Sequence, residues 1–198
     1  MSSPASKRKV GLLFGSFNPI HTGHLILAHF MATHTDLEEV WLVVSPQSPF
    51  KVDHHLLPEQ HRLELVQLAI AGNTRLRALD VEFRMPKPSY TVDTLDELRR
   101  QHPECHFVLL MGEDNVAGLP QWKQADRILA ENNIYVYPRP GVGEGLPAEL
   151  HPHVHVVPAP VLGISATFIR ECVRAGKSIR YLVPEAVEAK IKAAGYWR

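Results

Sequence analysis

The chain has 198 residues, of which 45% are hydrophobic and 21% are charged. This length and composition can bury a sizeable core, are typical of one globular domain over 1–198 with a flexible N-terminus at 1–9, and exclude a disordered chain. The 21 basic residues balance the 21 acidic ones, so the composition argues against a nucleic-acid partner and favours small ligands.

Targeting signals and cysteines indicate the compartment. The N-terminal stretch "MSSPASKRKV" lacks the apolar segment of a secretory signal, and no apolar run reaches the ~20 residues of a membrane span. Cys105 and Cys172 lie far apart, which is neither a disulfide framework nor a CxxC metal pair. We therefore expect a cytoplasmic protein with no membrane contact.

Short β-rich runs alternate with helical patterns along the chain. The expected elements, in chain order, are strand 10–14, helix 24–33, strand 40–44, helix 58–71, strand 76–81, helix 92–101, strand 105–111, helix 123–131, strand 133–137, strand 153–157, helix 166–175 and helix 184–194. This order predicts an α/β protein with a doubly wound parallel sheet and helices on both faces. Two breaker-rich stretches, 45–58 and 138–152, are expected to be surface loops or lids.

The first motif, "GSFNPIHTGH" at 15–24, follows the first expected strand and leads into the first expected helix. Ligands of such sheets bind outside the carboxyl ends of the strands. Gly15 allows close approach of the backbone, and a helix start offers unpaired N–H groups that favour anions. His21 and His24 are three residues apart, so they project to roughly the same side. The motif predicts a phosphate clamp.

The histidine pair has two other interpretations. The pair could merely cap and pad a helix, or bind zinc, but no cysteine or carboxylate is spaced to complete a zinc site. The dinucleotide fingerprint and the P-loop signature are both absent from this stretch. Further histidines are expected to be solvated surface residues rather than metal ligands: His54, His55, His151, His153 and His155.

The second motif is "GISATFIR" at 163–170. Ser165 is a good N-cap candidate, Thr167 falls in the first turn, and Arg170 adds a permanent cation to the same helix start. Taken alone, this could be ordinary capping with a surface arginine. Together with the first motif, it favours a second phosphate-binding element.

The combination of "NPIHTGH" and "ISATFIR" resembles the nucleotidyltransferase superfamily, and the whole chain resembles the bacterial nicotinate-nucleotide adenylyltransferases. The resemblance covers nearly the full length, because further segments match in order and spacing: "SPFK" 48–51, "HRLEL" 61–65, "SYTVDTL" 89–95, "MGEDN" 111–115, "QW" 121–122, "RPG" 139–141 and "IRYLVPEAV" 179–187. It implies a Rossmann-like fold.

The resemblance also implies the reaction. ATP and nicotinate mononucleotide would give nicotinate adenine dinucleotide, the precursor of NAD, and pyrophosphate, by direct in-line attack on the α-phosphorus. Mg²⁺ would sit mainly on phosphates and water. His21 and His24 would be catalytic, with His24 at the α-phosphate. The implied ATP-binding residues are Gly15, Ser16, Phe17, His21, His24, Lys51, Gly112, Asp114, Ile164, Ser165, Thr167 and Arg170.

The acceptor site is likewise implied by resemblance. Ser16, Thr91 and Trp122 would surround nicotinate mononucleotide, with the indole stacked on the pyridine ring. Trp122 could instead be a core anchor. Asp114, expected at the ATP ribose, could be a solvated loop residue.

Three positions depart from the common family pattern: Phe14, Phe50 and Ala166. They bear on loop geometry and ATP affinity more than on reaction type. Two alternatives stay open: a superfamily transferase with a different acceptor, and a nucleotide-binding protein without catalysis.

Overall fold

The computed structural model describes residues 7–46, 56–138, 152–160 and 162–198. In these residues one six-stranded sheet runs in the order β3-β2-β1-β4-β5-β6, and every neighbouring pair is parallel. The strands are β1 (Arg8–Gly15), β2 (Glu39–Val44), β3 (Leu76–Leu79), β4 (Cys105–Gly112), β5 (Asn133–Tyr137) and β6 (Val154–Val156).

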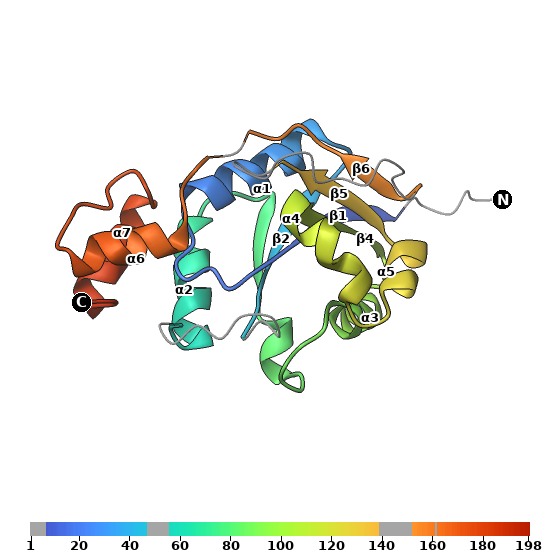
Figure 1. The fold of residues 1–198 in the computed structure, drawn as a ribbon, viewed down its shortest axis with the longest axis horizontal. Helices are drawn as coiled ribbons and strands as arrows, with labels where there is room; N and C mark the ends of the chain where they lie inside the picture. Colours follow the sequence, from blue (N-terminus) through green and yellow to red (C-terminus); the bar gives the residue numbers. More distant parts are fainter. Residues whose placement is uncertain (1–6, 47–55, 139–151, 161) are drawn as a thin grey trace.

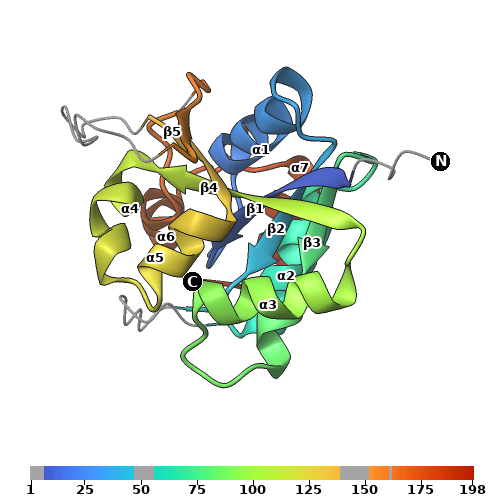
Figure 2. The ribbon, with the colours of Figure 1, turned by 90° about the vertical axis from the view of Figure 1, so that its right-hand side faces the viewer.

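Helices cover both faces of the sheet (Figures 1 and 2). They are α1 (Thr22–His34), α2 (Glu59–Ala69), α3 (Thr91–Gln101), α4 (Glu113–Gly118), α5 (Ala125–Glu131), α6 (Ala166–Arg174) and α7 (Glu185–Ala194), with 3₁₀ turns η1 (Val81–Arg84) and η2 (Leu119–Gln121). Side chains of α1, α2, α6 and α7 belong to one core, and those of α3, α4 and α5 belong to the other. The predicted doubly wound, Rossmann-like parallel sheet is confirmed.

Alternate strand residues supply the two cores. On β2, Leu42 packs into the α1 core, whereas its neighbours Trp41 and Val43 pack into the α3 core. Because both faces are covered, β2 and β4 are apolar along almost their whole length, as expected for buried parallel strands.

Most element boundaries differ from the prediction by one or two residues; in particular, β1 begins at Arg8, so residues 8 and 9 of the expected flexible N-terminus belong to a strand. β3 ends at Leu79 rather than at 81, because the backbone turns at Asp80, whose carbonyl accepts a hydrogen bond from Phe83. α5 begins at Ala125, because Gln124 has φ 54°, a left-handed conformation that a right-handed helix cannot include. α4 and η2 occupy 113–121, where no helix was predicted. Most of the loop stretches 45–58 and 138–152 lie outside the described residues.

The sheet positions the motifs at one edge. The chain winds from β1 to β2 and β3, then returns to place β4 on the other side of β1. Gly15 and Gly112 end these two adjacent strands, so they flank the point where the winding reverses, which is the usual ligand crevice of such sheets.

The C-terminal helices α6 and α7 lie at one end of the molecule, and α7 packs against α2 (Figure 1). The segment that connects α6 to α7 is hydrogen-bonded to the start of α1. Thr22 donates its backbone N–H to the Leu182 carbonyl at 2.9 Å and its hydroxyl to the Tyr181 carbonyl at 3.0 Å. Lys190 of α7 pairs with Glu64 of α2 at 2.6 Å. No helix in the described part of the chain has the length and apolarity to cross a bilayer.

Candidate active site

The loop at 15–21 joins β1 to α1 in a compact form. Phe17 has φ 45°, in the left-handed region, yet its side chain is buried. Its ring packs over Gly15, where a Cβ would lie only 2.9 Å from the ring. Any side chain at this strand end would therefore force the buried Phe17 ring to shift. Ser16, between them, is exposed.

The two histidines lie ring on ring at the start of α1. His21 is the N-cap residue and is buried, and its ring stacks on that of His24 with centroids 3.6 Å apart. A side chain at Gly23 would place a Cβ 3.2 Å from the His21 ring, which explains the glycine between them. The predicted projection to one side is confirmed, although α1 begins at Thr22 rather than at 24.

A backbone hydrogen bond fixes the tautomer of His24. Its Nδ1 lies 3.3 Å from the backbone N–H of His21 and accepts from it. In the neutral imidazole the proton then resides on Nε2, so Nε2 is the donor nitrogen. Because His24 occupies the third helical position, this donor belongs to the same turn as the N–H groups at the start of α1.

The second motif caps α6 as predicted. The Ser165 hydroxyl accepts from the Phe168 backbone N–H at 3.1 Å. Thr167, in the first turn, accepts from Arg170 Nη2 at 3.3 Å. Ile164 lies immediately before the cap and is half-buried.

Arg170 joins the two motifs. It is only 8% exposed, and its Nη1 donates to the Asn18 carbonyl at 2.9 Å, across 152 residues of sequence. The alternative of a surface arginine is therefore wrong. The loop 15–21 and the start of α6 form one polar constellation at the carboxyl edge of the sheet.

The other predicted ATP-site residues lie past β4. Gly112 ends β4 and is the N-cap residue of α4, and it is buried. Asp114 lies in the first turn of α4, where its exposed carboxylate is favourably placed for the helix dipole. Lys51 and Phe50 lie outside the described residues.

Two of the three predicted acceptor residues, Thr91 and Trp122, belong to adjoining segments. Thr91 begins α3, and Trp122 follows η2 and packs in part against the α3 core. Lys123 links the segments, because its Nζ lies 2.7 Å from the Asp93 carboxylate and 5.0 Å from the centre of the Tyr90 ring. Trp122 is half-buried, an arrangement that suits both an anchor and a residue with an accessible indole face.

Sequence reasoning missed two buried charged residues beside the site. Glu82 is 2% exposed, and its carboxylate accepts from the Ser89 and Thr94 hydroxyls, both at 2.8 Å, which holds the segment before Thr91. Arg62 of α2 is fully buried and donates to the Ser16 carbonyl. Arg62 lies on the same face of α2 as Leu65, in an otherwise apolar stripe. A charged residue in such a stripe was the sequence signal that could have revealed its burial.

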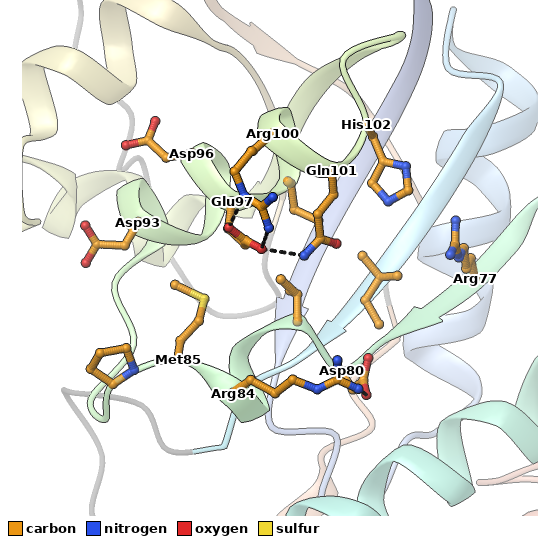
Figure 3. Close-up of a pocket in the computed structure, with 14 residues that line it drawn as sticks. Arg77, Asp80, Arg84, Met85, Asp93, Asp96, Glu97, Arg100, Gln101 and His102 are labelled. Atoms are coloured by element: carbon orange, nitrogen blue, oxygen red, sulfur yellow. Dashed lines mark hydrogen bonds and ion pairs between the residues drawn. The ribbon is translucent and has the colours of Figure 1, made fainter.

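A cavity of about 720 Å³ lies elsewhere, between η1 and α3 (Figure 3). None of the predicted site residues lines it. Two of its carboxylates pair with arginines that also line it: the Arg100 hydrogen bonds lower the pKa of Glu97 to about 2, and Arg84 faces Asp80 at 3.9 Å. We assign no function to it.

The described residues contain no group of three or more His, Cys, Asp or Glu side chains that could hold a metal ion. His153 Nδ1 lies 3.3 Å from the Asn133 side-chain oxygen, and the His155 ring packs edge-on against Tyr135. His54, His55 and His151 lie outside the described residues. Cys105 and Cys172 are free and buried.

Comparisons with known proteins identify the family. The model of the cytidylyltransferase-like family matches residues 12–172. A relative from Cytophaga hutchinsonii is 52% identical over 189 residues, which cover 96% of this chain and 98% of the relative, and one from Bacteroides fragilis is 47% identical over 186 residues. Both are named "Probable nicotinate-nucleotide adenylyltransferase".

A solved structure has the same fold. It is the Plasmodium falciparum nicotinic acid mononucleotide adenylyltransferase complexed with NaAD, with a TM-score of 0.78 over 96% of this chain and 97% of that chain, at 18% identity. The sequence relatives and the family model together settle the assignment: the chain belongs to the nicotinate-nucleotide adenylyltransferases, within the wider cytidylyltransferase-like family.

Proposed function

We propose that this enzyme joins ATP and nicotinate mononucleotide to give nicotinate adenine dinucleotide and pyrophosphate, in the biosynthesis of NAD. The observation that carries the proposal is the union of the two motifs through Arg170 and Asn18, which gathers histidines, hydroxyls and a helix start at one sheet edge. An oxygen of the mononucleotide 5′-phosphate attacks the α-phosphorus of ATP. A new P–O bond forms as the bond to the β-phosphate breaks, and pyrophosphate leaves with that electron pair.

Such a transfer asks for positioning and charge stabilisation more than for covalent chemistry by the protein. His24 Nε2, the donor in the neutral tautomer, is aimed at the charge that develops on the α-phosphate. His21 stacks beside it at the N-terminal end of α1, where the helix dipole favours an anion. Gly15 and Phe17 shape the loop that brings these groups to the triphosphate.

The leaving pyrophosphate is assigned to the second motif. Ser165, Thr167 and Arg170 present hydroxyls, a helix start and a cation to the β- and γ-phosphates, and Lys51 is expected to approach from the stretch 47–55. Ile164, Gly112 and Asp114 are assigned to the adenosine part, with the Asp114 carboxylate at the ribose hydroxyls.

The acceptor is assigned to Ser16, Thr91 and Trp122, with the indole on the pyridine ring. Mg²⁺ is expected to enter with ATP, held by phosphate oxygens and water, because the described residues offer no multidentate metal cage. When bound, the ion would neutralise phosphate charge. The cytoplasmic location stays a prediction.

The experiment supplies the purified protein with ATP and Mg²⁺ and varies the acceptor. We expect dinucleotide and pyrophosphate with nicotinate mononucleotide, and slower formation with the nicotinamide analogue. Turnover with phosphopantetheine instead would favour a superfamily transferase with another acceptor. Binding of ATP with no pyrophosphate release for any acceptor would favour a nucleotide-binding protein without catalysis.

A further inference from the structure

Arg62 is a charged side chain in a fully buried position. It lies on α2, on the same helical face as Leu65 and Val66, and is 0% exposed. Among the residues that the structure describes, no carboxylate lies within ion-pair distance of its guanidinium. An isolated cation in such a place is costly unless every donor is satisfied.

Backbone carbonyls take up the guanidinium donors. Nη1 donates to the carbonyls of Ser16 at 2.5 Å and Ser45 at 2.7 Å, Nη2 donates to that of Pro46 at 2.9 Å, and Nε donates to that of Leu57 at 2.8 Å. A planar fork with five N–H donors can make this set of bonds, and a lysine ammonium cannot. The three segments it ties together are the loop 15–21, the residues just after β2, and the residues just before α2.

Two neighbouring bonds reinforce the same junction. The Ser45 backbone N–H donates to the Gly15 carbonyl at 2.9 Å, and the Leu57 N–H donates to the Asn18 side-chain oxygen at 3.2 Å. The backbone carbonyl of Asn18 in turn accepts a hydrogen bond from Arg170. The loop 15–21 is therefore clamped at Ser16 and Asn18 by two buried arginines from different helices.

Stability alone is a poor explanation for a buried cation, since replacement of buried charges by well-packed apolar residues is often neutral or stabilising. Desolvation lowers the pKa of Arg62 to about 10, against the opposing field of Glu59, which shows that burial opposes the charged form. What the guanidinium fork supplies, and a lysine ammonium would not, is a fixed geometry for the Ser16 carbonyl and the loop around it.

We propose that Arg62 is a positioning residue of the reaction: through the Ser16 carbonyl it holds the loop 15–21 in the conformation that aligns the triphosphate for in-line attack. This inference rests on the proposed function. Loss of the fork leaves the triphosphate bound by the two motifs but misaligned, and small misplacements cost far more in rate than in binding. Arg62→Lys keeps the charge and removes the fork.

The experiment compares Arg62→Lys with two control variants in steady-state assays well below their melting temperatures. Arg75→Lys makes the same substitution at the amino end of the sheet, where Arg75 donates to the carbonyls of Ala32 at 3.0 Å and Glu38 at 3.4 Å. Leu98→Ala lowers stability from a buried position in α3.

We expect Arg62→Lys to lower kcat by about tenfold or more with a smaller change in the KM for ATP, whereas both controls keep kcat within about twofold. A kcat for Arg62→Lys within about twofold of the unmodified enzyme, or one that falls only as much as that of Leu98→Ala at equal loss of stability, would overturn the inference. Absence of turnover in the unmodified enzyme would instead refute the proposed function, so the two failures are distinguishable.

Discussion

Replacement of Arg170 by alanine separates two roles that the structure gives to one side chain. The guanidinium is buried, and its charge-assisted hydrogen bond to the Asn18 carbonyl spans 2.9 Å. Removal of such a bond costs about 1.5–3 kcal/mol. For a chain of this size, we expect the melting temperature to fall by about 3–12 °C. If the same cation also binds the leaving phosphates, a similar loss raises the KM for ATP by about 10- to 150-fold.

The assay measures kcat, both KM values and the melting temperature on the same protein samples. We expect the KM for ATP to rise far more than the KM for nicotinate mononucleotide, because the second motif is assigned to the triphosphate alone. Arg174→Ala is the matched control, since this exposed arginine lies one turn further along α6. A lower melting temperature with an unchanged KM for ATP would show that Arg170 does not bind the phosphates. Its role would then be limited to the structural hydrogen bond between the two motifs.

Substitutions at three further residues test the roles of the α-phosphate donor, the acceptor site and a surface ion pair. His24→Ala should lower kcat by ~10²–10³, because it removes a donor aimed at the charge of the transition state, and a near-normal kcat would exclude that role. Trp122→Ala should lower kcat/KM for the mononucleotide by roughly 5- to 150-fold while Trp122→Phe recovers much of the loss; a lower melting temperature with an unaltered mononucleotide KM would make Trp122 a core anchor. The Arg127 hydrogen bond lowers the pKa of Asp96 in the folded protein, so its contribution is present at neutral pH and is lost as pH falls below the ordinary value of 3.8. Because the Asp96 side chain is 44% exposed, Asp96→Asn should cost less than about 1 kcal/mol at pH 7 in urea unfolding, and this difference should shrink towards pH 3; a constant difference would contradict the linkage.

The alternation of strands and helices was predictable because the apolar runs are long and regular. A buried parallel strand such as β4 is apolar along almost its whole length, and the order of elements then restricts the topology. Short elements were not predictable. α4 and η2 follow a strand directly and contain Gly118 and Pro120, which favour a loop interpretation.

The site was predictable where its residues are local in sequence. The three-residue spacing of His21 and His24 and the cap at Ser165 depend on one helix start each, and the structure has both. The bonds of Arg62 to Ser16 and of Arg170 to Asn18 are not local, because each guanidinium meets a carbonyl whose position only the assembled fold determines. Backbone carbonyls carry no residue-specific signal, so sequence patterns cannot reveal them as partners.

Labelled ATP tests directly whether nicotinate mononucleotide attacks the α-phosphorus of ATP. The purified enzyme is given Mg²⁺, nicotinate mononucleotide and ATP labelled at either the α- or the γ-phosphorus. The account predicts that the α-label appears in the dinucleotide and the γ-label appears in pyrophosphate, with the two products in equal amounts. Transfer of the γ-label to the mononucleotide with release of ADP would contradict attack at the α-phosphorus and, with it, the assignment of the two motifs.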